Sequence, residues 1–183
     1  MTGTHTKVKF TYQDYLHMPG DKRYELIGGE FFVVTSPNEH HQRISRELEY
    51  ALLTYVKKNK SGFVYYAPFD VVFSDEDVVQ PDIVFVSEER KNIIAKDNIQ
   101  GPPDLIVEII SPKTGYRDRG IKRKLYCEYG VKEYWIVDPA EQTVEVLTFI
   151  ENDYKTENIY PADGILYSPL LKGLEIDLNI IFS

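Results

Sequence analysis

The chain has 183 residues, of which 43% are hydrophobic and 13% aromatic. This length is enough to bury a core and predicts one domain over residues 1–183. The composition is that of a globular protein and not of a disordered chain. The formal net charge of -8 excludes a uniformly basic nucleic-acid binder, although it leaves room for a local basic patch. No apolar run approaches the roughly 18 residues of a membrane span, and no signal-peptide segment is visible. The single cysteine, Cys127, suits a reducing compartment. We therefore expect a cytoplasmic protein with no membrane partner.

Turn residues and apolar periodicity predict the elements of the first half of the chain. Thr11 can cap a helix, the pair Gly28-Gly29 is typical of a hairpin turn, and apolar residues recur at helical spacing after residue 38. The expected elements are a loose tail (1–9), a short helix (12–16), a hairpin (24–35), a long helix (39–58), one strand or a strand pair interrupted at Pro68 (63–73), a strand (78–86) and a short helix or loop (87–98).

The second half begins with a turn at Gly101-Pro-Pro, which leads into an apolar run typical of a strand buried on both faces. The expected elements are that strand (104–110), a helix that ends at Gly130 (117–129), a strand (131–137), a hairpin (143–160) and a terminal apolar segment (178–182). This mixture predicts an α/β (α+β) fold, with a central mixed sheet flanked by helices.

Glu108 stands in the middle of the apolar run, between Val107 and Ile109. An ionised carboxylate is costly to bury there unless it is paired, protonated or bound to a metal. Asp82 follows Pro81 early in the preceding predicted strand, and the two carboxylates can converge if the strands are neighbours. Oxygen ligands of this kind suit Mg²⁺ or Mn²⁺. The alternative is that Asp82 is only a turn residue.

A basic stretch follows the strand. Residues 113–124 contain six basic residues and one acidic residue, a net charge of +5. Such a patch beside a carboxylate pair suits a polyanionic substrate. In the expected helix Lys122 and Tyr126 lie four residues apart, on one face. The alternative for Lys122 is a solvated helix face.

Other polar residues are less decisive. Gln80 shares a strand face with Asp82, and Glu25 and Asp70 either line a cleft or face solvent. His40 and His41 stand at the start of the long helix. Because no cysteine or further histidine lies at partner spacing, a polar helix-start role is favoured for them over a metal site.

Several segments, taken together in their order and spacing, resemble the Uma-two family of small endonucleases within the PD-(D/E)xK, restriction-endonuclease-like superfamily. The similarity covers nearly the full chain. Its carriers are residues 23–30, 41–42, 68–70, 79–86, 103–112, 117–120, 134–139 and 168–171.

The resemblance implies that Asp82 and Glu108 hold Mg²⁺ (or Mn²⁺) with a backbone carbonyl next to Glu108. Ile110 stands two residues after Glu108, where the superfamily motif has a lysine. The resemblance places that role on Lys122, which would orient the attacking water or neutralise charge on the phosphate. The remaining expected site residues are Glu25, Asp70, Gln80 and Tyr126 in the cleft, and Lys113, Arg117 and Arg119 against the nucleic acid.

The leading hypothesis is therefore a Mg²⁺-dependent endonuclease that hydrolyses phosphodiester bonds of DNA, and analogy with restriction enzymes suggests a homodimer. A second hypothesis is a catalytically silent relative that acts as a DNA-binding or protein-interaction module. A third is a small-molecule hydrolase that uses the same carboxylates. Convergence of Asp82, Glu108 and Lys122 would favour the first over the second.

Overall fold

Two β-sheets and the helices around them make up the computed structural model, which describes residues 8–112 and 114–183. The larger sheet has six strands in the order β11-β10-β9-β8-β6-β3 and is mixed, because β8 and β9 are parallel while the other pairs are antiparallel. Its strands are β3 (Gly62–Tyr66), β6 (Ile83–Ser87), β8 (Leu105–Ile109), β9 (Glu133–Asp138), β10 (Thr143–Ile150) and β11 (Asp153–Pro161). The predicted mixed sheet is confirmed.

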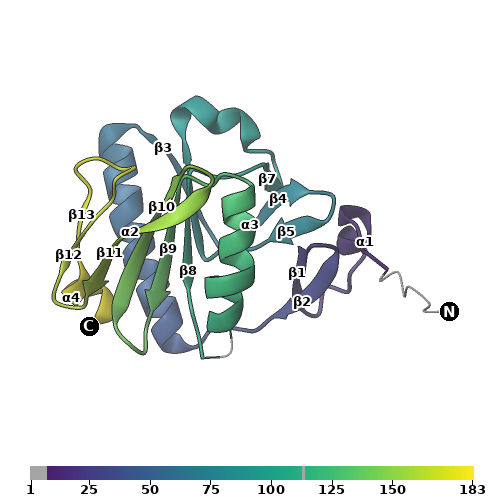
Figure 1. The fold of residues 1–183 in the computed structure, drawn as a ribbon, viewed down its shortest axis with the longest axis horizontal. Coiled ribbons are helices and arrows are strands. Elements are labelled where there is room, and N and C mark those ends of the chain that lie inside the picture. The colour runs from purple at the N-terminus through teal and green to yellow at the C-terminus, as the bar shows by residue number, and fades with distance from the viewer. Residues whose placement is uncertain (1–7, 113) are drawn as a thin grey trace.

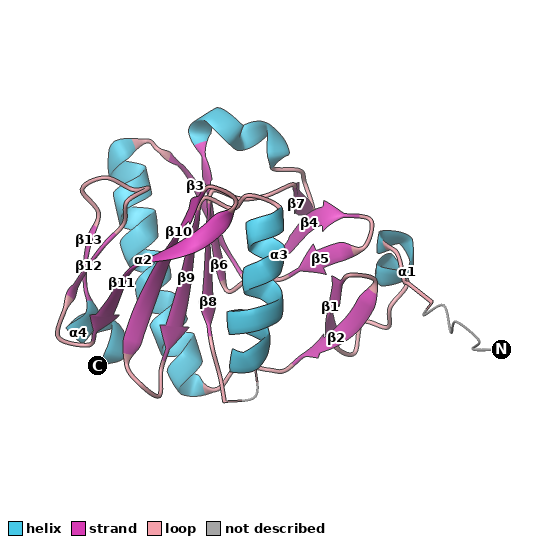
Figure 2. Ribbon diagram, in the orientation of Figure 1, coloured by secondary structure: helices cyan, strands magenta, loops and turns pink. Residues whose placement is uncertain are grey.

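The second sheet has five strands in the order β2-β1-β5-β4-β7 and lies to one side of the first (Figure 2). Its strands are β1 (Arg23–Ile27), β2 (Glu30–Val34), β4 (Asp70–Ser74), β5 (Asp77–Val79) and β7 (Asn98–Gln100). The predicted hairpin is β1–β2, and its turn needs glycine because Gly28 and Gly29 have φ of 59° and 77°. A small third sheet pairs β12 (Ile165–Tyr167) with β13 (Glu175–Asp177).

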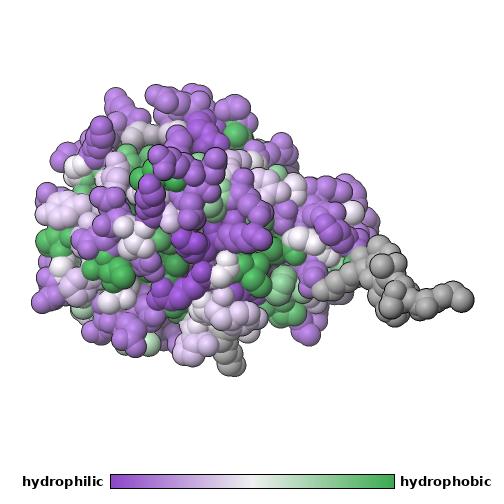
Figure 3. Space-filling view, in the orientation of Figure 1, coloured by the Kyte–Doolittle hydropathy of each residue, from purple (hydrophilic) through white to green (hydrophobic). Residues whose placement is uncertain are grey.

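Helices cover both faces of the six-stranded sheet (Figure 1). The helical segments are α1 (Tyr12–Leu16), α2 (Glu39–Asn59), a 3₁₀ turn (Glu88–Ile93), a π-helical segment (Arg117–Lys122) that continues directly into α3 (Arg123–Glu128), and α4 (Leu178–Phe182). None of the helices that the structure describes has the length and apolar composition of a membrane-spanning helix. The side of the molecule that carries α3 is mostly hydrophilic, with apolar residues in scattered patches (Figure 3).

The alternation of side chains along β8 divides the core into two layers. Leu105, Val107 and Ile109 pack on the side of α2, whose buried stripe includes Ile44 and Leu48. Ile106 and Ile110 face the opposite layer, which contains Leu125 and Tyr126 of α3. Because successive side chains of a strand point to opposite faces, Glu108 is directed toward α3. This alternation places a carboxylate of the sheet against the helical segment that carries Lys122.

The predicted strand over residues 78–86 is wrong, because the structure divides it between the two sheets. β5 ends at Val79 in the five-stranded sheet and β6 begins at Ile83 in the six-stranded sheet. Pro81 lies between them, and a residue without an N–H cannot continue a ladder of hydrogen bonds. Asp82 therefore stands at the point where the chain crosses from one sheet to the other. The strand β7 was also not predicted.

Candidate active site

Glu108 is buried in the sheet, with 4% of its surface exposed. One of its two carboxylate oxygens, Oε1, is bound by two protein groups. Tyr126 donates its hydroxyl to Oε1 at 2.6 Å, and the ammonium of Lys122 lies 2.8 Å from the same oxygen. Among the described residues no donor binds Oε2 of Glu108. Within the part of the chain that the structure describes, the second oxygen therefore has no partner.

Lys122 reaches the site from the π-helical segment and is 2% exposed, which excludes a solvated helix face. Its Nζ lies 2.7 Å from Glu25 Oε1, 2.8 Å from Glu108 Oε1 and 3.7 Å from Asp118 Oδ1. Burial alone would lower the pKa of Lys122, but the surrounding carboxylates raise it above its usual value. The side chain therefore stays an ammonium ion and is no general base.

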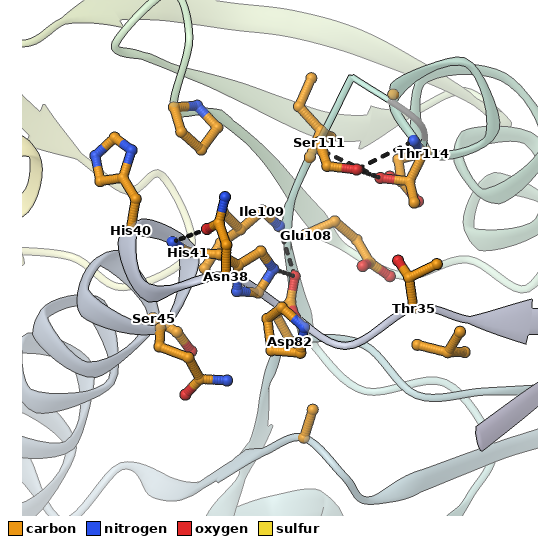
Figure 4. A pocket seen from close by; sticks show the side chains of 18 of the residues that line it. Thr35, Asn38, His40, His41, Ser45, Asp82, Glu108, Ile109, Ser111 and Thr114 are labelled. Atoms are coloured by element: carbon orange, nitrogen blue, oxygen red, sulfur yellow. Dashed lines mark hydrogen bonds and ion pairs between the residues drawn. The ribbon is translucent and has the colours of Figure 1, made fainter. Parts of the chain in front are cut away.

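Asp82 is held against β8 at the residue that follows Glu108. Its Oδ2 accepts the backbone N–H of Ile109 at 2.7 Å and lies 3.2 Å from Nε2 of His41 (Figure 4). No described donor binds its Oδ1. Asp82 and Glu108 line the same cleft, of about 1150 Å³, and each has an oxygen without a partner among the described residues. Asp82, Glu108 and Lys122 thus line one cleft, and Lys122 contacts Glu108 directly.

His41 is a site residue that the sequence reasoning missed. Its backbone does have the expected helix-start role, because its N–H is capped by the Asn38 side chain at 2.9 Å. Its ring, however, turns toward Asp82, while His40 turns away (Figure 4). Burial would lower the pKa of His41, but the hydrogen bond and charge of Asp82 raise it above 6.5. No local pattern signals this contact, since it joins the start of α2 to the crossing between the sheets.

We expect His41→Gln to destabilise the protein more at pH 6 than at pH 8. A histidine whose pKa is raised on folding contributes stability below pH 6.5, and this contribution is lost as the pH rises through the folded-state pKa. The loss at pH 6 should be about 1 kcal/mol or more, as for hydrogen bonds to charged groups. Urea unfolding at the two pH values measures it, with His40→Gln as control; an equal loss at both would contradict an ionic contact with Asp82.

Glu25 does not face solvent, since only 1% of it is exposed. Its Oε1 accepts the backbone N–H of Gln80 at 3.1 Å, and its Oε2 lies 3.6 Å from Arg117 Nη2. Gln80 in turn donates its side-chain amide to Asp70 Oδ1 at 2.8 Å, as does the hydroxyl of Tyr15. Glu25 and Gln80 line the cleft, whereas Asp70 and Tyr126 are not among its lining residues. Asp70 and Tyr126 instead form hydrogen bonds with Gln80 and Glu108, which do line the cleft.

The basic stretch does not form one continuous basic surface. Arg117 is 7% exposed, pairs with Glu25 and lies over the ring of Phe32. Arg119 is half exposed, but it pairs with Asp138 at 3.1 Å and with Glu145 at 2.9 Å. Lys113, also expected at the nucleic acid, lies outside the described residues. Of the described basic residues of this stretch, Arg117 and Lys122 are buried, and Arg119 is paired with carboxylates.

Several carboxylates lie close together at the floor of the cleft. Glu25, Glu108 and Asp118 lie around the ammonium of Lys122, Glu25 also faces Arg117, and the charge of Asp82 acts on Glu108. Burial raises the pKa of Glu108 to about 8, against the opposing charge of Lys122 and with the help of the neighbouring carboxylates.

Side chains of the described residues can supply only part of the ligands that a hard cation needs. In residues 8–112 and 114–183 no three histidine, cysteine or acidic side chains are grouped closely enough to hold a metal ion. Asp82 and Glu108 would supply two carboxylate oxygens, and a backbone carbonyl beside Glu108 and water would complete the sphere. Magnesium is commonly held by one or two carboxylates together with water.

The mixed sheet covered by helices, with a carboxylate-lined cleft at the crossing between two sheets, defines a mixed α/β protein. A solved structure from Anabaena variabilis, described as a "putative nuclease belonging to DUF820", superposes with a TM-score of 0.79 at 21% identity, over 94% of this chain and 97% of that chain. This likeness shows the fold.

The family model Uma2, described as "Putative restriction endonuclease", matches residues 12–179. The chain therefore belongs to the Uma2 family, and the family resemblance of its sequence motifs is confirmed. No curated protein matches the chain significantly.

Proposed function

We propose that this protein hydrolyses phosphodiester bonds of DNA with a Mg²⁺ or Mn²⁺ ion held by Asp82 and Glu108. The observation that carries the proposal is the position of Lys122, whose ammonium lies 2.8 Å from Glu108 although it comes from a helix instead of the strand. The motif lysine is absent at Ile110, and Lys122 supplies a cation at the same carboxylate. Membership of the Uma2 family supports a nucleic-acid substrate.

The protein residues have distinct roles in this mechanism. The Ile109 N–H and His41 fix one oxygen of Asp82 and leave the other in the cleft. Tyr126 and Lys122 do the same for Glu108. Lys122 remains charged and can stabilise negative charge that develops on the phosphate. A bound divalent ion supplies an activated water and neutralises charge on the phosphoryl oxygen.

Cleavage of supercoiled plasmid tests the proposal. We expect nicked and linear products with Mg²⁺ or Mn²⁺, and none with EDTA. Asp82→Asn should lower the rate by at least about 100-fold, because it removes charge from the proposed ion site. Glu133→Gln is a matched control, since Glu133 is also a buried carboxylate but is bound to Trp135 and Ser168, outside the cleft. Equal cleavage by wild type and Asp82→Asn would contradict the assigned site.

A second candidate function is a catalytically silent module that binds nucleic acid or protein. It is favoured by the ligand set, in which two carboxylates have no third side-chain ligand among the described residues. DNA binding in gel-shift assays, with no cleavage of double- or single-stranded DNA or RNA in any divalent metal, would favour this candidate.

A further inference from the structure

Lys122 is bound by carboxylates from two different sheets. Glu25 belongs to β1 of the five-stranded sheet, and Glu108 belongs to β8 of the six-stranded sheet. Their Oε1 atoms lie 2.7 Å and 2.8 Å from Nζ. The ammonium is thus shared almost equally, and its position depends on both partners.

Glu25 is itself fixed from the segment that carries Asp82. The backbone N–H of Gln80, two residues before Asp82, is donated to Glu25 Oε1, the same oxygen that binds Lys122. The other oxygen, Oε2, is buried and accepts no hydrogen bond from any described group, although Arg117 lies 3.6 Å away. Without a facing cation, a carboxylate so placed would be an uncompensated buried charge, which is costly.

Asp118 offers Lys122 a competing position. It lies one helical turn before Lys122, and its Oδ1 is 3.7 Å from Nζ. The two short contacts, to Glu25 and Glu108, hold Nζ between the sheets, and Asp118 is the more distant partner. Without the charge of Glu25, the pull of Asp118 along its own helix is opposed only by Glu108.

We propose that Glu25 is a positioning residue that holds the Lys122 ammonium at Glu108. Glu25 acts through Lys122, so its effect on catalysis rests on the nuclease function proposed above. Its effect on the location of Lys122 does not depend on that function.

The kinetic test is Glu25→Gln, which keeps the shape and an oxygen acceptor but removes the charge. We expect kcat for DNA cleavage to fall by about 100-fold, as for a displacement of a catalytic group by about 1 Å. KM should change by less than about twofold, because uniform substrate binding is unaffected. Glu133→Gln controls for neutralising a buried carboxylate and should leave both constants unchanged. An unchanged kcat in Glu25→Gln would overturn the proposal.

The second readout needs no activity. In a ¹H–¹⁵N spectrum of lysine ammonium groups, a buried and hydrogen-bonded Nζ exchanges its protons slowly and gives its own signal, which Lys122→Met would identify by its loss. We expect Glu25→Gln to shift or broaden this signal and Glu133→Gln to leave it in place. An unchanged signal in Glu25→Gln would overturn the proposal.

Two further outcomes stay informative. If Glu25→Gln does not fold, Glu25→Asp keeps the charge but shortens the side chain, and we expect a shifted Lys122 signal with a smaller loss of kcat. An unchanged signal in that variant overturns the proposal. If wild type cleaves nothing, the nuclease function fails, and the ammonium signal still decides whether Glu25 holds Lys122.

Discussion

Glu108→Gln is expected to abolish cleavage and at the same time to stabilise the metal-free protein at alkaline pH. Burial raises the pKa of Glu108 from 4.5 to about 8. A carboxyl group whose pKa is raised on folding contributes its full stability below pH 4.5, and that contribution is lost as the pH rises to about 8. Glutamine cannot ionise, so the variant avoids this loss. Burial of the charged form is the main cause, and the charges of Asp118, Asp82 and Glu25 add to it.

The difference in the free energy of unfolding between Glu108→Gln and wild type should grow between pH 5 and pH 8.5. It should reach a few kcal/mol, since a tenfold change in an ionisation constant is worth about 1.4 kcal/mol. Urea unfolding in EDTA at both pH values measures it. Cleavage should fall by at least about 100–1,000-fold. A variant less stable than wild type at pH 8.5 would mean that the attraction between Glu108 and Lys122 outweighs the burial of charge.

The same variant separates metal binding from folding. Mg²⁺ should stabilise wild type, by about 2.7 kcal/mol at a concentration 100 times its dissociation constant. This gain should be absent in Glu108→Gln if Glu108 is a ligand. An equal gain in both proteins would place the ion elsewhere.

Lys122→Met is expected to cause the largest loss of stability of any single change at the site. Methionine has a similar length but no charge, so it leaves Glu25, Glu108 and Asp118 facing one another without the shared ammonium. Removing one partner of a buried ion pair costs about 3–5 kcal/mol. Thermal and urea unfolding measure the loss. Cleavage should disappear as well.

A matched control lies two residues further along the same helix. Lys124 is exposed and pairs only loosely with Glu128, at 3.9 Å, so Lys124→Met should change stability by less than about 0.5 kcal/mol. Combining Lys122→Met with Glu108→Gln should recover part of the lost stability, because it removes one of the uncompensated charges. Simple additivity of the two changes would contradict a direct interaction between them.

Local sequence patterns were sufficient to predict the helices and strands whose signals lie within the element itself. Glycine at the β1–β2 turn, the apolar stripe of α2 and the apolar run of β8 each depend on neighbours within a few residues, and each element is present. The run also marked Glu108 as exceptional, because a charge inside it is costly to bury. Patterns of this range could not reveal that residues 78–86 divide between two sheets, although Pro81 in the middle was a usable signal.

The contacts that complete the site are long-range and had no such signal. Glu25 meets Lys122, and His41 meets Asp82, only because two sheets and α2 come together in space. In the basic stretch, by contrast, a local pattern was visible but led to a wrong expectation. Its charges are close in sequence, but helical geometry turns Arg117 and Lys122 inward while Arg119 faces two surface carboxylates. Counting charges gives their number and not the face on which they lie.

The crossing between the sheets at residues 80–82 ties the site to the cohesion of the whole molecule. Glu25 stands on the smaller sheet, Glu108 on the larger one, and Asp82 on the connection between them. Ile27, Val79 and Ile99 of the smaller sheet share one buried cluster with Ile106 of the larger sheet and Leu125 of α3. Proteins open in cooperative units whose stabilities differ, so packing that joins the two sheets also keeps the two anchors of Lys122 together. A change in that shared core would therefore reach the site even where it touches none of the site's residues.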